Sequence, residues 1–172
     1  MNELKTWENL IEAFRLYRED IFTFVFFRCN RVKDLAEDIT QETFEKAWVK
    51  RDLFKGGNLR NWLFQIASNS TKDSLKKNNK EIGLDKDFEI EESENELYKF
   101  YVAKSLQQMK PREQELVILH YVLGYTYKEI SEIYSENENT IRVSVFRAFD
   151  KLKNIANGKI KWYKIKRDIT YF

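Results

Sequence analysis

Residues 138–147 carry polar, basic and aromatic side chains that could recognise the edges of DNA bases. The set comprises Glu138, Asn139, Arg142, Phe146 and Arg147. Arginine can donate two hydrogen bonds to guanine, asparagine can pair similarly with adenine, and either can contact phosphate. These residues form a candidate DNA-reading surface. The alternative, equally weighted at this point, is a solvated charged face of an ordinary helical bundle.

Two short helices joined by a tight turn are expected to position this surface. Thr126 and Glu129 have the spacing of a capping box, which predicts a helix that begins there and ends near Tyr134. A turn at 135–137 and a second helix over 138–152 follow. The two helices can pack through apolar side chains at Ile130, Ile133, Tyr134, Ile141 and Val145. This arrangement indicates a helix-turn-helix, whose second helix enters the major groove.

The helix before this pair has recognisable start and stop residues. Pro111 suits a first helical turn, where its missing N–H is not needed. Gly124 lies where a left-handed C-terminal cap is expected. The sequence therefore predicts a helix between them, packed beside the helix-turn-helix.

Residues 34–48 predict an amphipathic helix with a charged stripe. Its start is expected at Asp34, whose side chain would accept from the Glu37 N–H. Four polar residues at i, i+3, i+4 and i+7 lie opposite the apolar face: Asp38, Gln41, Glu42 and Glu45. The stripe is either an ordinary solvated face or a docking surface for a basic or polar helix of a partner.

A further helix is predicted from Leu59 to Leu75, and it continues into lysines. Its basic side chains, Arg60, Lys72, Lys76 and Lys77, could neutralise nucleic-acid phosphates. Aromatic faces can also hold unstacked bases. Trp62, however, shares a helical face with apolar residues, so we expect it in the core.

Composition and charge indicate an all-α chain divided into blocks. One Pro and five Gly in 172 residues favour long helices and short connections. The formal net charge of +2 combines an acidic stretch at 81–96 with a basic stretch at 151–167. We expect two small helical domains, a three- or four-helix bundle at 7–77 and a helix-turn-helix domain at 97–156. An acidic linker at 78–96 would join them, and a basic aromatic tail would follow at 157–172.

Several features argue against a secreted protein or an enzyme. Cys29 is the only cysteine, so neither an internal disulfide nor a cysteine metal site is expected. The N-terminus lacks the apolar core of a signal peptide, and the longest apolar stretch is too short to span a bilayer. The single histidine, His120, fits a packing role, and no hydrolase, P-loop or zinc-protease motif occurs. We expect a cytoplasmic protein without catalytic residues, metal or cofactor.

Two blocks of sequence resemble the extracytoplasmic-function (ECF) group of the sigma-70 family of RNA polymerase sigma factors. AEDITQETFEKAW at 36–48 is similar to region 2.2, and NWLFQIASN at 61–69 is similar to regions 2.3 and 2.4. Residues 109–153 are similar to region 4, with GYTYKEI at 124–130, TIR at 140–142 and RA at 147–148. Both blocks occur in the order that the family has, so the resemblance covers about 7–77 and 97–153.

The resemblance implies a role for each surface. The stripe at Asp38, Gln41, Glu42 and Glu45 would bind core RNA polymerase through its β′ subunit, and the protein as a whole would contact the β and β′ subunits. The −10 element of promoter DNA would be contacted by Arg60, Asn69, Lys72, Lys76 and Lys77. The −35 element would be contacted by Glu138, Asn139, Thr140, Arg142, Ser144, Phe146 and Arg147. An anti-sigma factor is a further implied partner.

The chain departs from the family pattern at two places. After Arg142 the family usually has a small residue and then Arg, whereas Val143 and Ser144 stand here, so one expected −35 contact is missing. The tail could bind DNA, an anionic membrane or a sheet edge of a partner, or cover region 4. The acidic linker could enter the RNA path of the polymerase or serve as a solvated tether.

Two other functions fit parts of the sequence. A DNA-binding regulator that does not bind polymerase would need the helix-turn-helix, but neither the 36–48 stripe nor the basic 61–77 helix. An enzyme acting on nucleic acid would need a metal or nucleophile constellation, and no such spacing is evident. Core-polymerase binding separates the sigma factor from both.

Overall fold

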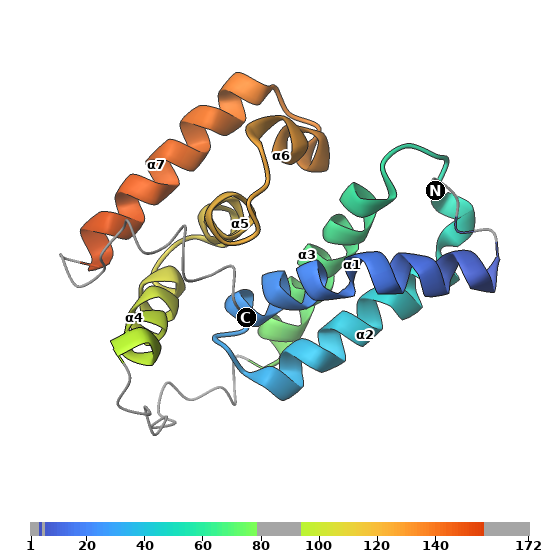
Figure 1. The fold of residues 1–172 in the computed structure, drawn as a ribbon, viewed down its shortest axis with the longest axis horizontal. Coiled ribbons are helices and arrows are strands. Elements are labelled where there is room, and N and C mark those ends of the chain that lie inside the picture. Colours follow the sequence, from blue (N-terminus) through green and yellow to red (C-terminus); the bar gives the residue numbers. More distant parts are fainter. Residues whose placement is uncertain (1–3, 5, 79–93, 157–172) are drawn as a thin grey trace. The chain divides into compact units, whose positions relative to one another are not determined.

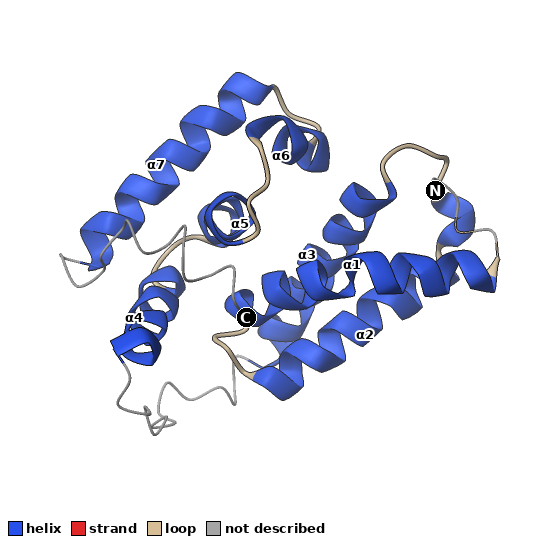
Figure 2. Ribbon diagram, in the orientation of Figure 1, coloured by secondary structure: helices blue, strands red, loops and turns tan. Residues whose placement is uncertain are grey.

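The computed structural model describes residue 4 and residues 6–78 and 94–156, and this part of the chain contains helices and no strand (Figures 1 and 2). The described residues fall into two compact units, one before and one after the boundary between residues 82 and 83. This confirms the predicted all-α fold. The linker residues 79–93 and the tail 157–172 lie outside the described residues.

The first unit consists of three long helices, α1 (Trp7–Arg28), α2 (Lys33–Val49) and α3 (Leu59–Asn78). All three pairs of helices are in contact. Ala13, Ala36, Ala47 and Ala67 are fully buried, and such small side chains let helices approach closely. Phe24 of α1 meets Phe64 of α3 edge to face, with ring centroids 5.4 Å apart. Trp62 is half-buried and packs against Phe54 instead of lying in the centre of this core.

The start of α2 differs from the prediction. The helix begins at Lys33 after Val32, and no side chain caps it, so the expected Asp34 cap is wrong. Asn30 and Arg31 adopt left-handed conformations with φ of 57° and 63°, and the Arg31 N–H donates to the Phe26 carbonyl. This tight reversal brings the chain into helical geometry two residues early, with Val32 in place of Asp34 at the N-cap position. Asp34 therefore lies in the first turn, where its negative charge interacts favourably with the positive end of the helix dipole.

The second unit consists of α4 (Glu94–Gln107), α5 (Pro111–Val117), α6 (Tyr127–Tyr134) and α7 (Glu138–Ala156). Helix α7 contacts each of the other three. Its buried stripe, Ile141, Val145, Ala148, Leu152 and Ala156, recurs at the spacing of one helical face. Helix α4 begins within the segment expected to be linker.

The chain between α5 and α6 contains a turn that the sequence did not predict. Residues Ile118–Val122 form a π-helical turn, and the Leu123 N–H donates to the Ile118 carbonyl. Gly124 follows with φ of +73° and exits in the left-handed conformation expected of a C-terminal cap. The extra residue in the turn shifts the direction in which the chain leaves toward Tyr125.

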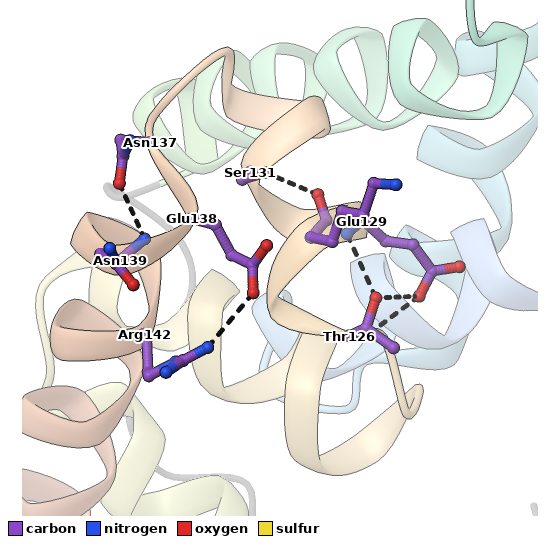
Figure 3. A network of polar contacts seen from close by, with 8 residues as sticks. Thr126, Glu129, Ser131, Asn137, Glu138, Asn139 and Arg142 are labelled. Carbon is purple, nitrogen blue, oxygen red and sulfur yellow. Dashed lines mark hydrogen bonds and ion pairs between the residues drawn. The ribbon is translucent and has the colours of Figure 1, made fainter.

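Helix α6 begins with the predicted capping box (Figure 3). The Thr126 hydroxyl accepts from the Glu129 N–H at 3.2 Å, and the Glu129 carboxylate accepts from the Thr126 N–H at 2.8 Å. Two N–H groups without helical partners are satisfied, and a helix of only two turns gains a fixed starting point.

Thr126→Ala should loosen α6 without unfolding the first unit. Losing an N-cap hydroxyl costs about 1 kcal/mol, so amide exchange of the peptide 127–134 should accelerate about fivefold. Hydrogen exchange read by mass spectrometry measures this. Thr140→Ala removes the same atoms from an exposed position of α7 and should leave the 127–134 peptide unchanged. Equal acceleration in both variants would contradict the capping role.

The Cys29 thiol should react only after unfolding. The residue is 1% exposed, and burial raises the pKa of the thiol to about 12. At pH 8 the native thiolate fraction is then about a thousandfold below that of an ordinary cysteine. A disulfide reagent that releases a coloured thiol should therefore label the native chain at least about a thousandfold more slowly than the urea-unfolded chain. Rapid labelling of the native chain would show that this end of α1 opens readily.

Candidate nucleic-acid interface

Helices α6 and α7 form the predicted helix-turn-helix. Ser135 ends α6 in a left-handed conformation with φ of 54°, which reverses the chain without a glycine. Asn137 then accepts from the Asn139 N–H at 2.9 Å and caps the start of α7 (Figure 3). The left-handed backbone of Ser135 and the capping side chain of Asn137 thus take the place of the usual glycine in this turn.

Apolar packing fixes the orientation of α7 about its own axis. Ile130 and Ile133 of α6 and Ile141 and Val145 of α7 are all buried, as the sequence predicted. Tyr134 is half-buried, and its hydroxyl donates to Glu115 of α5 at 2.7 Å. Burial and the neighbouring Glu115 carboxylate raise the pKa of Tyr134, so its hydroxyl stays protonated and keeps donating. The α7 face opposite these contacts is exposed.

Charged groups outside this core join further helices of the unit. The Arg112 guanidinium lies 3.3 Å from the centre of the Tyr134 ring and pairs with Glu136 at 2.6 Å. Lys151 of α7 pairs with Glu113 of α5 at 2.6 Å. Burial alone raises the pKa of Glu113, but hydrogen bonds from Lys151 and the Lys110 N–H outweigh it and lower the pKa overall. These contacts connect α5 with α6 and α7.

The structure places most of the predicted −35 residues on the exposed side of α7. The exposed members are Asn139, Thr140, Arg142, Phe146 and Arg147. Glu138 and Ser144 are half-buried. Ser144 lies at the edge of the exposed face, whereas its neighbour Val143 lies within it. Val143 was absent from the predicted set, although its spacing of four residues from both Asn139 and Arg147 could have identified it.

Arg142 is held at the start of α7 by two neighbours. Its guanidinium lies 3.3 Å from the Glu138 carboxylate, one turn earlier (Figure 3). The same group lies 5.5 Å from the centre of the Tyr127 ring. His120 stacks on that ring, with centroids 4.5 Å apart, and its Nδ1 contacts the Tyr125 carbonyl at 2.8 Å. His120 therefore packs within the unit, as expected.

In the first unit, the stripe on α2 is only partly free for a partner. Asp38, Gln41 and Glu45 are exposed, and the Gln41 amide donates to Glu45 at 2.8 Å. Glu42 is half-buried and pairs with Lys46 at 2.7 Å. Because Lys46 also donates to Ser70 of α3 at 3.0 Å, Glu42 belongs to a contact between helices. The stripe therefore has three outward-facing members.

Helix α3 separates the predicted −10 residues into two groups. Asn69, Lys72, Lys76 and Lys77 are exposed on its C-terminal half. Arg60 precedes Asn69 by nine residues, so the two point in roughly opposite directions at about 100° per residue. Arg60 lies 3.5 Å from Asp20 of α1. The sequence did not reveal that Arg60 faces a helix of the same unit.

Residues 4, 6–78 and 94–156 contain no cluster of three or more His, Cys, Asp or Glu side chains that could hold a metal ion. Within the same ranges, every helix is too short or too polar to cross a bilayer.

Two family models match the chain in succession. The model described as "Sigma-70 region 2" matches residues 13–81, and that described as "Sigma-70, region 4" matches residues 99–152. The first covers α2, α3 and all of α1 except its first turns. The second covers α5, α6 and most of α4 and α7.

Known sigma factors are similar to the chain in sequence and fold. The ECF RNA polymerase sigma factor SigM of Bacillus subtilis is 27% identical over 154 residues, which cover 85% of this chain and 94% of that protein. The sigma factor RpoE of Bartonella quintana, solved with its anti-sigma factor NepR, has a TM-score of 0.68 and 25% identity. That match covers 88% of this chain and 98% of RpoE. CnrH, solved with the cytosolic domain of CnrY, has a TM-score of 0.63 at 16% identity and agrees in fold; the match covers 89% of this chain and 90% of CnrH.

Regions 2 and 4 thus occur here in one chain, with region 2 first. The chain belongs to the sigma-70 family of RNA polymerase sigma factors, in its extracytoplasmic-function group, and directs promoter-specific initiation of transcription.

Proposed function

We propose that this sigma factor assigns the steps of promoter recognition to three separate surfaces. The exposed face of α7 reads the −35 element, the C-terminal half of α3 contacts the −10 element, and the α2 stripe binds core polymerase. The observation that carries the proposal is that each of these faces is exposed while the opposite face of its helix is buried.

For the −35 element, α7 would lie in the major groove with its N-terminal half toward the bases. Arg142 and Arg147 supply donors that suit guanine, and Asn139 suits adenine. Arg142 is partly preorganised by Glu138 and Tyr127, so less side-chain freedom is lost on binding. Thr140 at the edge of this face suits a contact to the DNA backbone.

For the −10 element, the cations of α3 would follow the phosphates of a partly opened duplex. Lys72, Lys76 and Lys77 provide the charge, and Asn69 provides both a donor and an acceptor for a base edge. Arg60 faces Asp20, so its proposed DNA contact requires exchange of that ion pair for a phosphate. This ion pair is partly open to water and its charged atoms are 3.5 Å apart, so such an exchange costs little.

For core polymerase, we propose Asp38, Gln41 and Glu45 as the direct contacts on α2. Their carboxylates and amide suit a basic or polar helix, in line with the proposed binding to the β′ subunit. Glu42 would act indirectly by orienting Lys46 and thereby holding α2 against α3. The β subunit is the second proposed contact of the polymerase.

An anti-sigma factor is proposed as the regulatory partner, and the cytoplasm as the compartment. The solved relative RpoE was captured with such a protein, the anti-sigma factor NepR. In domain terms, we propose region 2 at 7–77 and region 4 at 97–156. The activity we propose is recognition and binding, while the chemistry of RNA synthesis belongs to the polymerase.

A transcription assay tests the proposal directly. Purified protein with core polymerase should start transcripts at a defined promoter, and neither component alone should do so. Failure of the chain to bind core polymerase in a pull-down would contradict the sigma-factor function and favour a regulator that acts on DNA alone.

Arg142→Ala and Arg147→Ala should each weaken binding to a −35 duplex. Loss of a bidentate contact to a base costs ~1–3 kcal/mol, so affinity should fall by about fivefold to a hundredfold, with core binding unchanged. Titration of labelled duplex at fixed salt measures the effect. Arg15→Ala, an exposed arginine on α1, is the matched control and should bind as the wild type does. Parallel loss of core binding in the α7 variants would indicate misfolding instead.

The double variant Asp38→Ala, Gln41→Ala should weaken binding to core polymerase and leave DNA binding intact. We expect affinity for core polymerase to fall by about tenfold or more, since central polar contacts of an interface each contribute ~1 kcal/mol or more. Binding to the −35 duplex should be retained. Glu37→Ala, a quarter turn away on the same helix, should have little effect on core binding. An equal loss in this control would mean that general negative charge on α2 matters, not the stripe.

A further inference from the structure

Val143 and Phe146 form an exposed apolar pair on α7. Their exposed fractions are 47% and 66%, whereas Ile141 and Val145 between and beside them are fully buried. Residues three apart are neighbours on a helix surface, so the two side chains share one patch. The core does not use this patch, because α4, α5 and α6 are packed against the other side of α7.

The pair lies in the middle of the residues proposed to read DNA. Asn139, Val143 and Arg147 follow one another at steps of four, and Phe146 lies beside this row. Three residues beyond Arg147, the same face carries Asp150, an exposed carboxylate that pairs with Lys153 at 3.5 Å and still places negative charge where phosphates would approach. Approach of a duplex is therefore favoured along the first turns of α7. There the duplex would meet Val143 and Phe146, which are flanked by the polar side chains of Asn139 and Arg147.

An apolar side chain in the major groove can be accommodated by few base edges. Against most base edges it would cover donors or acceptors. These groups would lose their hydrogen bonds to water and gain none in return, which costs free energy. The 5-methyl group of thymine is the exception, because it is the apolar group that this groove presents. Val143 is also branched at Cβ and restricted to essentially one rotamer in a helix, so it loses little freedom on contact.

We propose that Val143 and Phe146 determine −35 specificity by packing on thymine methyl groups. This rests on the proposed placement of α7 in the major groove and adds the class of base that the exposed face selects. Where the family pattern has a small residue, this chain has Val143. Its −35 element accordingly contains thymine at positions next to those contacted by Asn139 and Arg147.

The test removes the methyl groups from the DNA without changing its hydrogen-bonding edges. The preferred −35 duplex is first selected from a random pool by holoenzyme assembled from core polymerase and the full chain. Each thymine is then replaced singly by deoxyuridine, and affinities are measured for the wild type, Val143→Ala, Val143→Thr and Phe146→Ala. Val49→Ala, which shortens an exposed valine of α2, is the matched control.

Deoxyuridine at one or two positions should weaken wild-type binding about fourfold, corresponding to ~0.8 kcal/mol for each methyl-sized group buried. Val143→Ala and Phe146→Ala should bind more weakly and lose the penalty for deoxyuridine at one position each. Val143→Thr keeps the shape and helix of the wild type and should reduce that penalty, while Val49→Ala should retain all of it.

Two results separate the possible failures. If every deoxyuridine duplex binds the wild type normally while Arg147→Ala still weakens binding, methyl recognition is wrong and the proposed −35 role stands. If neither deoxyuridine nor the arginine substitutions change binding, α7 does not read this DNA, and both proposals are overturned.

Discussion

The orientation of the DNA-reading surface depends on the burial of a single stripe of α7. Ile141, Val145, Ala148 and Leu152 are removed from water by α4, α5 and α6. Burying an aliphatic side chain of this size contributes about 1.5–3 kcal/mol, more than any exposed ion pair of the unit. Rotation of α7 about its axis would expose this stripe, so the polar row on the other side has one stable direction.

The polar contacts around this core have a different role from the apolar stripe. Thr126 with Glu129 and Asn137 with Asn139 fix where α6 and α7 begin. Tyr134 with Glu115, and Lys151 with Glu113, fix how these helices meet α5. Apolar burial supplies most of the stability, whereas these directional contacts limit the arrangement to one register.

Sequence reasoning succeeded where a local rule decides the structure. Thr126, Gly124 and Pro111 act through their immediate neighbours, and each lies where its pattern predicted. It failed where the structure is determined by a contact between residues distant in sequence or by a backbone reversal. The left-handed Asn30 and Arg31 moved the start of α2, Asp20 turned Arg60 toward α1, and the π-helical turn followed from packing that no motif encodes. Within the candidate sites, exposure separates Asn69 and Arg147 from Glu42 and Ser144, and the pattern alone could not make that distinction.

The buried position of Cys29 bears on how the protein can receive signals. Oxidants attack the thiolate of an accessible cysteine, and here the thiol is buried at the end of α1 and held in its neutral form. The sequence contains no second cysteine with which an internal disulfide could form. In the folded chain this thiol is thus poorly placed to react with an oxidant.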